Sequence, residues 1–255
     1  MADDVLAVTD DGAVRRLTFG RPDAANAFNE ELYLAVAAAL DQAAADDGVS
    51  VVVMTGEGRS FCAGTDLKEM ADLVLAQQAG TSDPDAGKGF ITLMDTLVAF
   101  PKPLLAAVNG TGVGLGLTML GHCDVVLIDE GARLLPPFTA MGVVPEAASS
   151  YLLPARMGRQ FASLALLASR WITAEEAVAH GLALRTCPSG TVVAETMAVA
   201  AEIAVHPVAS LVATKALIAE GERDAVAAAR AREDSAFAEI LQTPQLDEGI
   251  LGRLE

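Results

Sequence analysis

Residues 104–153, LLAAVNGTGVGLGLTMLGHCDVVLIDEGARLLPPFTAMGVVPEAASSYLL, decide the fold of this chain. The apolar run 104–108 predicts a buried strand, and Asn109-Gly110 breaks it. Glycines follow at positions 112, 114 and 116, and residues 117–120 predict one or two turns of buried helix. Such a strand, glycine-rich turn and helix start bring bare backbone close to a ligand. Free N–H groups at a helix N-terminus suit a negatively charged oxygen.

Glu146 lies near the end of this stretch in almost uncharged surroundings, directly after Pro145, and the pair predicts the start of a helix. A backbone anion site and one carboxylate beside an apolar patch are the parts needed to remove a proton next to a carbonyl. Two plainer interpretations stay open. An acid in a first helical turn is commonly a partner of the helix dipole, and alternating glycines also serve close packing without a ligand.

Composition and charge exclude several classes of function. The chain has 255 residues, 52% of them hydrophobic, with a net charge of −17 and a pI of about 4.4. So acidic a chain argues against binding to nucleic acid or to an anionic membrane, which need clustered Lys and Arg. Residues 103–121 carry no charge, but Pro103, Asn109 and five glycines interrupt them. They predict strand, turn and helix within a core rather than a membrane span.

The cysteines and the N-terminus favour a reducing compartment. Cys62, Cys123 and Cys187 have the spacing of neither a disulfide framework nor a zinc site, so we expect buried thiols, no metal and a cytoplasmic location. The first residues, MADDVLAV, have aspartates where a signal peptide has positive charge.

The first hundred residues predict alternating strands and helices. Residues 5–8 and 14–19 flank an Asp-Gly turn and predict a hairpin. Asn29 is placed as the N-cap of a long helix, and the continuous apolar run 51–54 predicts a strand covered on both faces. Asp66 and Glu69 have the spacing of a capping box, residues 76–88 predict a surface loop, and residues 89–99 a helix.

The last hundred residues predict mostly helix. Residues 160–169 have helical periodicity, Thr173 and Glu176 have the spacing of a second capping box, and residues 182–186 predict a short strand or turn. Helices are expected at 191–204, 208–221, 223–241 and 245–253. We therefore expect a core of residues 1–190 and a helical C-terminal region of residues 191–255.

Three sequence motifs resemble motifs of the crotonase (enoyl-CoA hydratase/isomerase) superfamily. FCAGTDLKEM (61–70) resembles its first oxyanion motif, AAVNGTGVGLGLTMLGHCD (106–124) its second, and GRPDAANAF (20–28) its coenzyme A-binding turn. Several motifs at suitable mutual distances are a more specific signal than one glycine-rich run. The resemblance implies an α/β fold, a spiral of ββα units followed by a helical C-terminal region used for trimerisation.

The resemblance also implies acyl-CoA thioester substrates and no cofactor, because coenzyme A is part of the substrate. The backbone N–H groups of Thr65 and Leu115 would hold the thioester oxygen as it gains enolate charge. A homotrimer or a dimer of trimers is implied. The substrate-binding positions implied by the motifs are Ala24, Ala25, Ala27, Ala63, Gly64, Asp66, Leu67, Lys68, Gly114 and Phe138.

Within the superfamily, the resemblance is to peroxisomal-type Δ3,Δ2-enoyl-CoA isomerases. Hydratases carry one glutamate on the helix after the second oxyanion turn and another further along, where this chain has Thr118 and Phe138. The isomerases share the pattern of residues 113–121 and the sequence PEAASSY at 145–151, in which the glutamate is the catalytic base. The resemblance therefore implies an isomerase of fatty-acid metabolism with Glu146 as its base.

Two other functions stay open. A hydratase, or another crotonase-type reaction, would need a different polar residue to take part, such as Asp66, Thr118 or Ser149. A non-catalytic acyl-CoA-binding subunit would keep the fold without the chemistry, because a fold does not fix a function.

Overall fold

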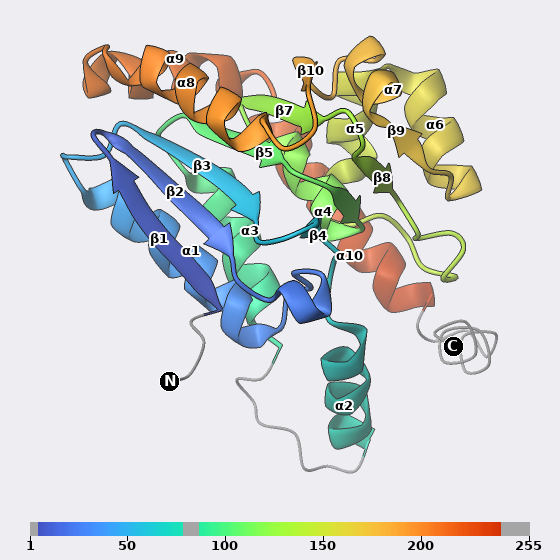
Figure 1. The fold of residues 1–255 in the computed structure, drawn as a ribbon. Helices are drawn as coiled ribbons and strands as arrows, with labels where there is room; N and C mark the ends of the chain where they lie inside the picture. The colour runs from blue at the N-terminus through green and yellow to red at the C-terminus, as the bar shows by residue number, and fades with distance from the viewer. Residues whose placement is uncertain (1–4, 79–86, 241–255) are drawn as a thin grey trace.

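The computed structural model describes residues 5–78 and 87–240, and a six-stranded sheet forms the centre of this part (Figure 1). The strand order is β1-β2-β3-β5-β7-β10. The strands are β1 (Leu6–Asp11), β2 (Val14–Phe19), β3 (Val51–Gly56), β5 (Leu104–Val108), β7 (Val125–Asp129) and β10 (Arg185–Cys187). The predicted N-terminal hairpin is confirmed, because β1 and β2 pair antiparallel around Gly12, while the other neighbours pair in parallel.

A smaller sheet of four short strands carries the loops of the candidate site. Its order is β4-β6-β8-β9, from β4 (Ser60–Cys62), β6 (Thr111–Val113), β8 (Arg133–Leu135) and β9 (Ile172–Thr173). β4, β6 and β8 each follow a strand of the large sheet along the chain, namely β3, β5 and β7. The chain thus steps repeatedly from the large sheet to the small one and then into a helix, which confirms the predicted α/β fold with ββα units.

The alternation of side chains along β3 divides the core between two faces of the large sheet. Val51 and Val53 pack with buried residues of α8 (Val192–Ala204), while Val52 and Met54 join the cluster that includes α1 (Glu30–Ala45) and α3 (Gly89–Ala99). Figure 1 shows this layering, with α8 and α9 (Val208–Glu220) on one side of the sheet and α1 and α3 on the other. All six residues of β3 are buried, as its uninterrupted apolar run predicts.

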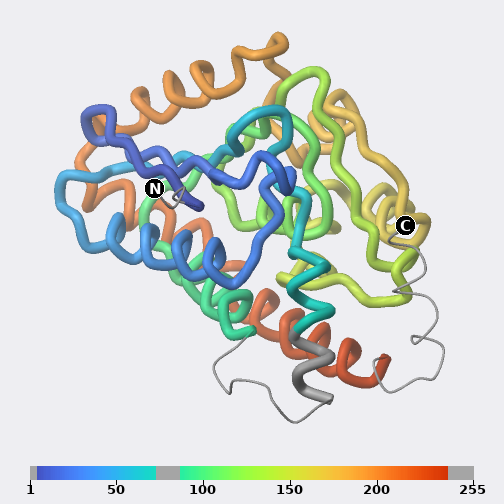
Figure 2. Tube along the Cα trace, turned by 60° about the horizontal axis from the view of Figure 1, so that its bottom comes forward, coloured from blue at the N-terminus to red at the C-terminus, as the bar shows by residue number. Residues whose placement is uncertain are grey.

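The remaining α-helices of the described residues are α2 (Leu67–Gln78), α4 (Leu115–Thr118), α5 (Ser149–Met157), α6 (Arg159–Ala168), α7 (Ala174–Ala179) and α10 (Arg223–Ile240). Two 3-10 helices span Pro22–Ala24 and Met119–His122. In Figure 1, α2 projects away from the body of the molecule. Figure 2 shows α10 along the lower edge of the molecule, where Arg230 pairs with Asp95 of α3 at 2.8 Å.

Several local predictions are confirmed. The Asn29 side chain accepts a hydrogen bond from Leu32 N at 3.1 Å and so caps α1. Thr173 and Glu176 form a complete capping box at the start of α7. The three cysteines are free and buried. The helices expected from residue 191 onward are present as α8, α9 and α10, except that the expected helix 245–253 lies outside the described residues.

Three local predictions are corrected. Glu146 does not begin a helix, because Ala147 and Ala148 adopt left-handed backbone conformations and α5 starts only at Ser149. The predicted capping box at Asp66 is half formed. The Asp66 carboxylate accepts from Glu69 N at 3.3 Å, but the Glu69 carboxylate accepts from Glu30 N rather than from the Asp66 backbone. The predicted loop 76–88 begins later, since α2 continues to Gln78, and residues 79–86 lie outside the described ranges.

The described helices were compared with the length and hydropathy of a membrane span. None of them alone is long and apolar enough to cross a bilayer. Helices α8 and α9 reach that length and hydropathy only when taken together, and they are bent by 106° at the break between them. The predicted division of the chain at residue 190 stays a prediction.

Candidate active site

The two glycine-rich turns of the sequence lie against each other. Strand β4 pairs in parallel with β6, with Cys62 opposite Gly112, so the segments that leave these strands are neighbours. Gly64 has a φ of 94°, and a Cβ atom there would lie 2.9 Å from the carbonyl oxygen of Val113. Gly114 has a φ of 52°. Both positions have positive φ, which favours glycine, and Gly64 also has a close backbone approach that leaves no room for a Cβ atom.

Two backbone N–H groups follow these glycines directly. Within the described residues, the amides of Thr65 and Leu115 donate to no backbone carbonyl, and Leu115 is the first residue of α4. A Cβ on Gly64 would lie 3.7 Å from Leu115 N, which places the two turns side by side. The structure therefore brings together the two residues that the sequence predicts for an oxyanion site. Two converging free N–H groups suit an oxygen that gains negative charge.

The segment 24–28 runs beside the first glycine turn. Ala63 N donates to Ala25 O at 3.0 Å, Phe28 N donates to Gly64 O at 2.7 Å, and Asp66 N donates to Phe28 O at 2.8 Å. The fully buried Asn26 side chain anchors the segment by donating to Ser60 O at 2.8 Å. The predicted substrate-binding residues Ala24, Ala25, Ala27, Ala63, Gly64 and Asp66 thus lie on adjoining backbone.

Two cationic side chains, Arg21 and Lys68, lie near this segment. Arg21 pairs with Asp66 at 2.9 Å and also donates to Ala27 O. Burial acts to raise the pKa of the Asp66 carboxyl, but the hydrogen bonds from Arg21 and from the Glu69 and Lys68 amides lower it. Lys68 is exposed on the first turn of α2, one residue after the half-buried Leu67. Arg21 therefore links the segment around Ala27 to the segment around Asp66.

Glu146 is directed towards α4. Thr118 Oγ1 donates to Glu146 Oε1 at 3.0 Å, and Thr118 itself is fully buried three residues after Leu115. Desolvation raises the pKa of Glu146 to about 7, a rise that the Thr118 hydrogen bond opposes and the charge of Glu233 increases. The residue keeps some solvent contact, but its carboxyl lies within the protein. A carboxyl with such a pKa is able both to accept and to return a proton near neutral pH.

Tyr33 lies beside the first glycine turn and within the electrostatic influence of Glu146. Its hydroxyl lies 2.8 Å from Thr65 Oγ1, and its ring packs edge-on against Phe28 and Phe90. Burial raises the pKa of Tyr33 well above its usual value, and the negative charge of Glu146 adds to that rise. Tyr33 therefore stays a neutral hydroxyl beside the turn.

A model of the family described as enoyl-CoA hydratase/isomerase matches residues 9–255. The chain belongs to the enoyl-CoA hydratase/isomerase family. A crystal structure of a family member from Pseudoalteromonas atlantica T6c has 35% sequence identity and a TM-score of 0.90, and the match covers 98% of this chain and 96% of that one. These findings confirm the crotonase fold that the three sequence motifs predict.

Curated relatives of this family member include both hydratases and isomerases. The 2,3-dehydroadipyl-CoA hydratase of Escherichia coli (strain K12) is 35% identical over 250 residues, which are 98% of this chain and 95% of that protein. Enoyl-CoA delta isomerase 2 of Rattus norvegicus is 35% identical over 231 residues. That match covers 89% of this chain and 58% of the rat protein, so the chain spans little more than half the length of that relative.

The two positions at which hydratases of the family were expected to carry glutamates hold no carboxylate here. The Thr118 hydroxyl donates a hydrogen bond to Glu146. Phe138 is buried in the main hydrophobic cluster, with 6% of its surface exposed. Leu135, three residues before Phe138, accepts a hydrogen bond from Gly114 N at 2.9 Å. Phe138 therefore follows shortly after a residue that contacts the second glycine turn, and it lies in apolar surroundings.

Sequence reasoning missed three polar residues around Glu146. Tyr33 contacts Thr65, His122 contacts the carbonyl of Ala147, and Glu233 contacts the backbone after Glu146. Tyr33 and Glu233 lie on long helices, far along the chain from residue 146. His122 does lie within the second motif, but its spacing to other polar residues matches no known site.

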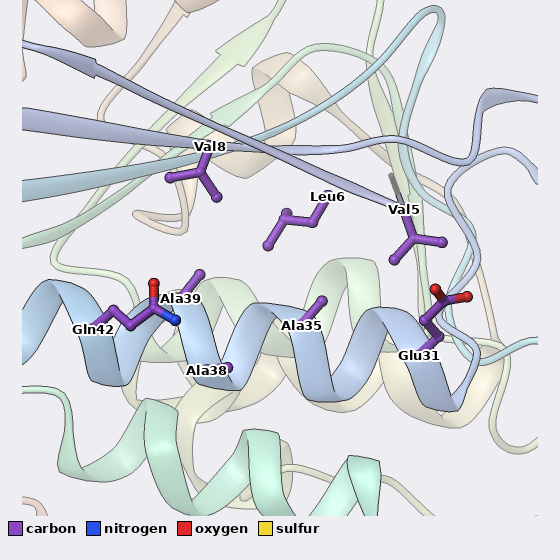
Figure 3. A pocket seen from close by; sticks show the side chains of 8 residues that line it. All are labelled: Val5, Leu6, Val8, Glu31, Ala35, Ala38, Ala39 and Gln42. Atoms are coloured by element: carbon purple, nitrogen blue, oxygen red, sulfur yellow. The ribbon is translucent and has the colours of Figure 1, made fainter. Parts of the chain in front are cut away.

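A surface groove lies apart from these residues, between β1 and α1. It has a volume of about 390 Å³, and Figure 3 shows Leu6 and Val8 above Ala35 and Ala39. Its polar lining side chains are Glu31 and Gln42. The groove shares no lining residue with the candidate active site.

Proposed function

We propose that this family member isomerises 3-enoyl-CoA thioesters to 2-enoyl-CoA thioesters, with Glu146 as the single shuttling base. The observation that carries the proposal is the hydrogen bond from Thr118 to Glu146. Thr118 occupies the position at which a hydratase would need a second carboxylate. Thr118 lies on the same short helix as Leu115, so Glu146 is joined to the second glycine turn.

The backbone amides of Thr65 and Leu115 provide the electrostatic part of the mechanism. They bind the thioester oxygen and stabilise the negative charge that develops on it when the C2 proton leaves. One such donor typically contributes about 2.7–4 kcal/mol in the transition state. The left-handed conformations at Gly64 and Gly114 direct both amides away from other carbonyls before substrate binds.

Glu146 provides the proton transfer. Its carboxylate takes the C2 proton, the electron pair delocalises into a dienolate, and the same carboxyl returns the proton to C4, which leaves the double bond between C2 and C3. A pKa of about 7 keeps both protonation states accessible near neutral pH. The buried Phe138 excludes water from the apolar wall, so the dienolate is protected from side reactions.

The remaining implied roles complete the proposal. Ala24, Ala25, Ala27, Ala63, Gly64, Asp66, Leu67, Lys68, Gly114 and Phe138 contact the thioester and its coenzyme A portion, with Lys68 as an exposed cation. The enzyme acts as a homotrimer or dimer of trimers, without a further cofactor, in the cytoplasm. The exposed Leu217 and Ile218 of α9 suit a subunit interface in the C-terminal region.

Hydration is the second candidate, and the similarity to the Escherichia coli hydratase over 98% of this chain favours it. A hydratase would need a second acid or base, and Ser149 is the polar side chain with the strongest claim. Its hydroxyl is buried and has no hydrogen-bond partner within the described part of the chain. A non-catalytic acyl-CoA-binding subunit remains the third alternative.

The deciding experiment compares two substrates with the wild-type protein. 3-Hexenoyl-CoA is followed for the conjugated 2-enoyl product, and crotonyl-CoA for loss of conjugation by hydration. Isomerisation without appreciable hydration supports the proposal. Fast hydration of crotonyl-CoA contradicts it and favours the hydratase. Binding of both thioesters without turnover supports the non-catalytic subunit.

A further inference from the structure

The backbone directly after Glu146 has an unusual conformation. Ala147 and Ala148 both have positive φ values, 59° and 58°, although neither is glycine. Left-handed backbone is strained for a non-glycine residue, so two such residues in succession persist only where neighbouring groups hold them. The conformation matters because it sets the direction of Glu146, which directly precedes the turn. The carbonyl oxygen of Glu146 accepts a hydrogen bond from Ser149 N at 2.9 Å.

One group that holds the turn is His122. Its Nε2 lies 2.9 Å from the carbonyl oxygen of Ala147. Burial lowers the pKa of His122 to about 4, so the imidazole is neutral at pH 7. A neutral ring can bond this carbonyl only in the tautomer that carries hydrogen on Nε2.

The second group is a carboxylate from the C-terminal helix. Glu233 accepts Ala148 N at 2.7 Å through Oε2 and Ser150 N at 2.8 Å through Oε1. Its residue surface is 6% exposed, and it lies 85 residues beyond Ala148 along the chain. Both N–H groups belong to the start of α5, where the orphan amides of a helix need an acceptor.

Helix α10 is fixed in place by contacts of residues that precede Glu233 in the chain. Arg156 of α5 makes two bonds to Glu222, at 2.8 and 3.1 Å, just before α10 begins. Arg230 pairs with Asp95 of α3, and Val226 and Ala229 pack against Ala148 and Leu152. The carboxylate of Glu233 is therefore delivered by a helix that is anchored independently of it.

We propose that Glu233 is a positioning residue, through which the C-terminal helix of the chain fixes the Ala147-Ala148 turn and thereby aims Glu146 at the substrate. The inference rests on the proposed function of Glu146. It extends that function, because it assigns a catalytic consequence to a helix outside the three sequence motifs.

Charge reinforces this geometry. The groups that face Glu146 are Thr118 of α4, Tyr33 of α1, Cys62 of β4 and Glu233 of α10. Glu233 is the ionisable neighbour that raises the pKa of Glu146 beyond the effect of burial. Glu233 is itself subject to desolvation, which raises its pKa, while its hydrogen bonds from Ser150 and Ala148 oppose the rise and the charge of Asp234 adds to it.

Two variants separate charge from placement. Glu233→Gln removes the charge. One of the two backbone N–H groups then faces the glutamine NH2 group, which cannot accept a hydrogen bond. We expect kcat for 3-hexenoyl-CoA to fall by about 10- to 100-fold, since a displacement of about 1 Å can cost on the order of 10²-fold. Glu233→Asp keeps the charge but shortens its reach. For this variant we expect a lower kcat and an unmoved acidic limb of the pH profile.

The matched control is Glu239→Gln, the same change at an exposed residue of the same helix. Isotope-labelled glutamate and NMR then follow the titration of Glu146 directly, with Glu146→Gln to assign its signal. In Glu233→Gln we expect this titration and the acidic limb of kcat/KM to move together to lower pH, with KM little changed. A purely structural role would lower the melting temperature and leave both titrations in place.

The outcomes also separate this inference from the proposed function. If the wild type turns over neither thioester, the proposed function fails, and the NMR titration alone decides whether Glu233 acts on Glu146. An unmoved Glu146 titration in folded Glu233→Gln overturns the inference. If Glu233→Gln does not fold, Glu233→Asp decides, because wild-type kcat in that variant would overturn the inference as well.

Discussion

The two parts of the candidate active site are held in different ways. The turns at Gly64 and Gly114 are fixed by backbone: parallel pairing of β4 with β6, positive φ values at both glycines and, at Gly64, a carbonyl contact that leaves no room for a Cβ atom. The turn after Glu146 is fixed by side chains, from His122 and from Glu233 on a distant helix. The first part depends on glycine, whereas the second depends on residues that only the folded chain brings together.

This difference explains which perturbation each part tolerates. A backbone-defined site loses its geometry when a methyl group is added, because the neighbouring atoms belong to the main chain and cannot rotate away. A site defined by side chains loses its function when a single polar group is removed, although the fold around it is preserved. The following predictions probe each part in turn.

The largest effect is expected from Glu146→Gln. The amide keeps the volume of the carboxyl and can still accept from Thr118, but it cannot take a proton. Isomerisation should fall by about 10²- to 10⁴-fold, the usual contribution of general base catalysis, with acyl-CoA binding retained. Steady-state kinetics and calorimetric binding check this. Glu175→Gln, at an exposed glutamate of α7, is the control, and equal turnover in both variants would exclude Glu146 as the base.

The next largest effect is expected from Gly64→Ala. The added Cβ would meet Val113 O at 2.9 Å on a residue whose φ is 94°, so the Thr65 and Leu115 amides should move apart. Loss of one oxyanion donor costs about 10²- to 10³-fold in kcat.

Gly190→Ala is the matched control for Gly64→Ala. Gly190 has a φ of 80°, but a Cβ there would have nothing within 4 Å. Both variants carry backbone strain, and only Gly64→Ala adds the clash at the site. Similar kcat values in both would show that the Gly64 turn has no special role in turnover.

Sequence motifs predicted the two glycine turns that the structure brings side by side. Gly64 and Gly116 lie where backbones approach closely, Gly114 has positive φ, and the parallel sheet follows from uninterrupted apolar runs such as 51–54. The side-chain-defined half was not predictable. Pro145-Glu146 has the pattern of a helix start, yet tertiary contacts from His122 and Glu233 stabilise left-handed backbone at Ala147 and Ala148 instead. No local propensity encodes a carboxylate supplied from 85 residues away.

A smaller effect concerns stability. The pKa of Glu146 is raised from 4.5 to about 7, so the folded state binds the proton more tightly than the unfolded chain does. Ionisation of Glu146 therefore destabilises the fold, and this penalty is absent below about pH 4.5 and complete above about pH 7. Glu146→Gln removes the penalty and should be more stable than wild type at pH 8.5 by about 1–3 kcal/mol, given about 1.36 kcal/mol per pKa unit and the residue's partial solvent contact.

Urea unfolding of wild type and Glu146→Gln at pH 5 and pH 8.5 measures this difference. The increase in the free energy of unfolding of Glu146→Gln over wild type should be largest at pH 8.5 and shrink towards pH 5. A gain that does not depend on pH would mean that Glu146 ionises freely in the folded protein, and its suitability as a proton shuttle would then need another cause.

The smallest effect is expected from Thr118→Val, which tests the contact that joins the two halves of the site. Valine fills the fully buried position but removes the hydroxyl that donates to Glu146 Oε1 at 3.0 Å. That bond lowers the pKa of Glu146, so its loss should raise the pKa and move the acidic limb of kcat/KM to higher pH. At pH 6.5, turnover should fall by roughly 3- to 10-fold, the equivalent of one hydrogen bond. Thr118→Ser keeps the hydroxyl and should keep the limb in place, even if the small cavity lowers stability. A limb that moves equally in both variants would assign the effect to packing around α4 rather than to the hydrogen bond.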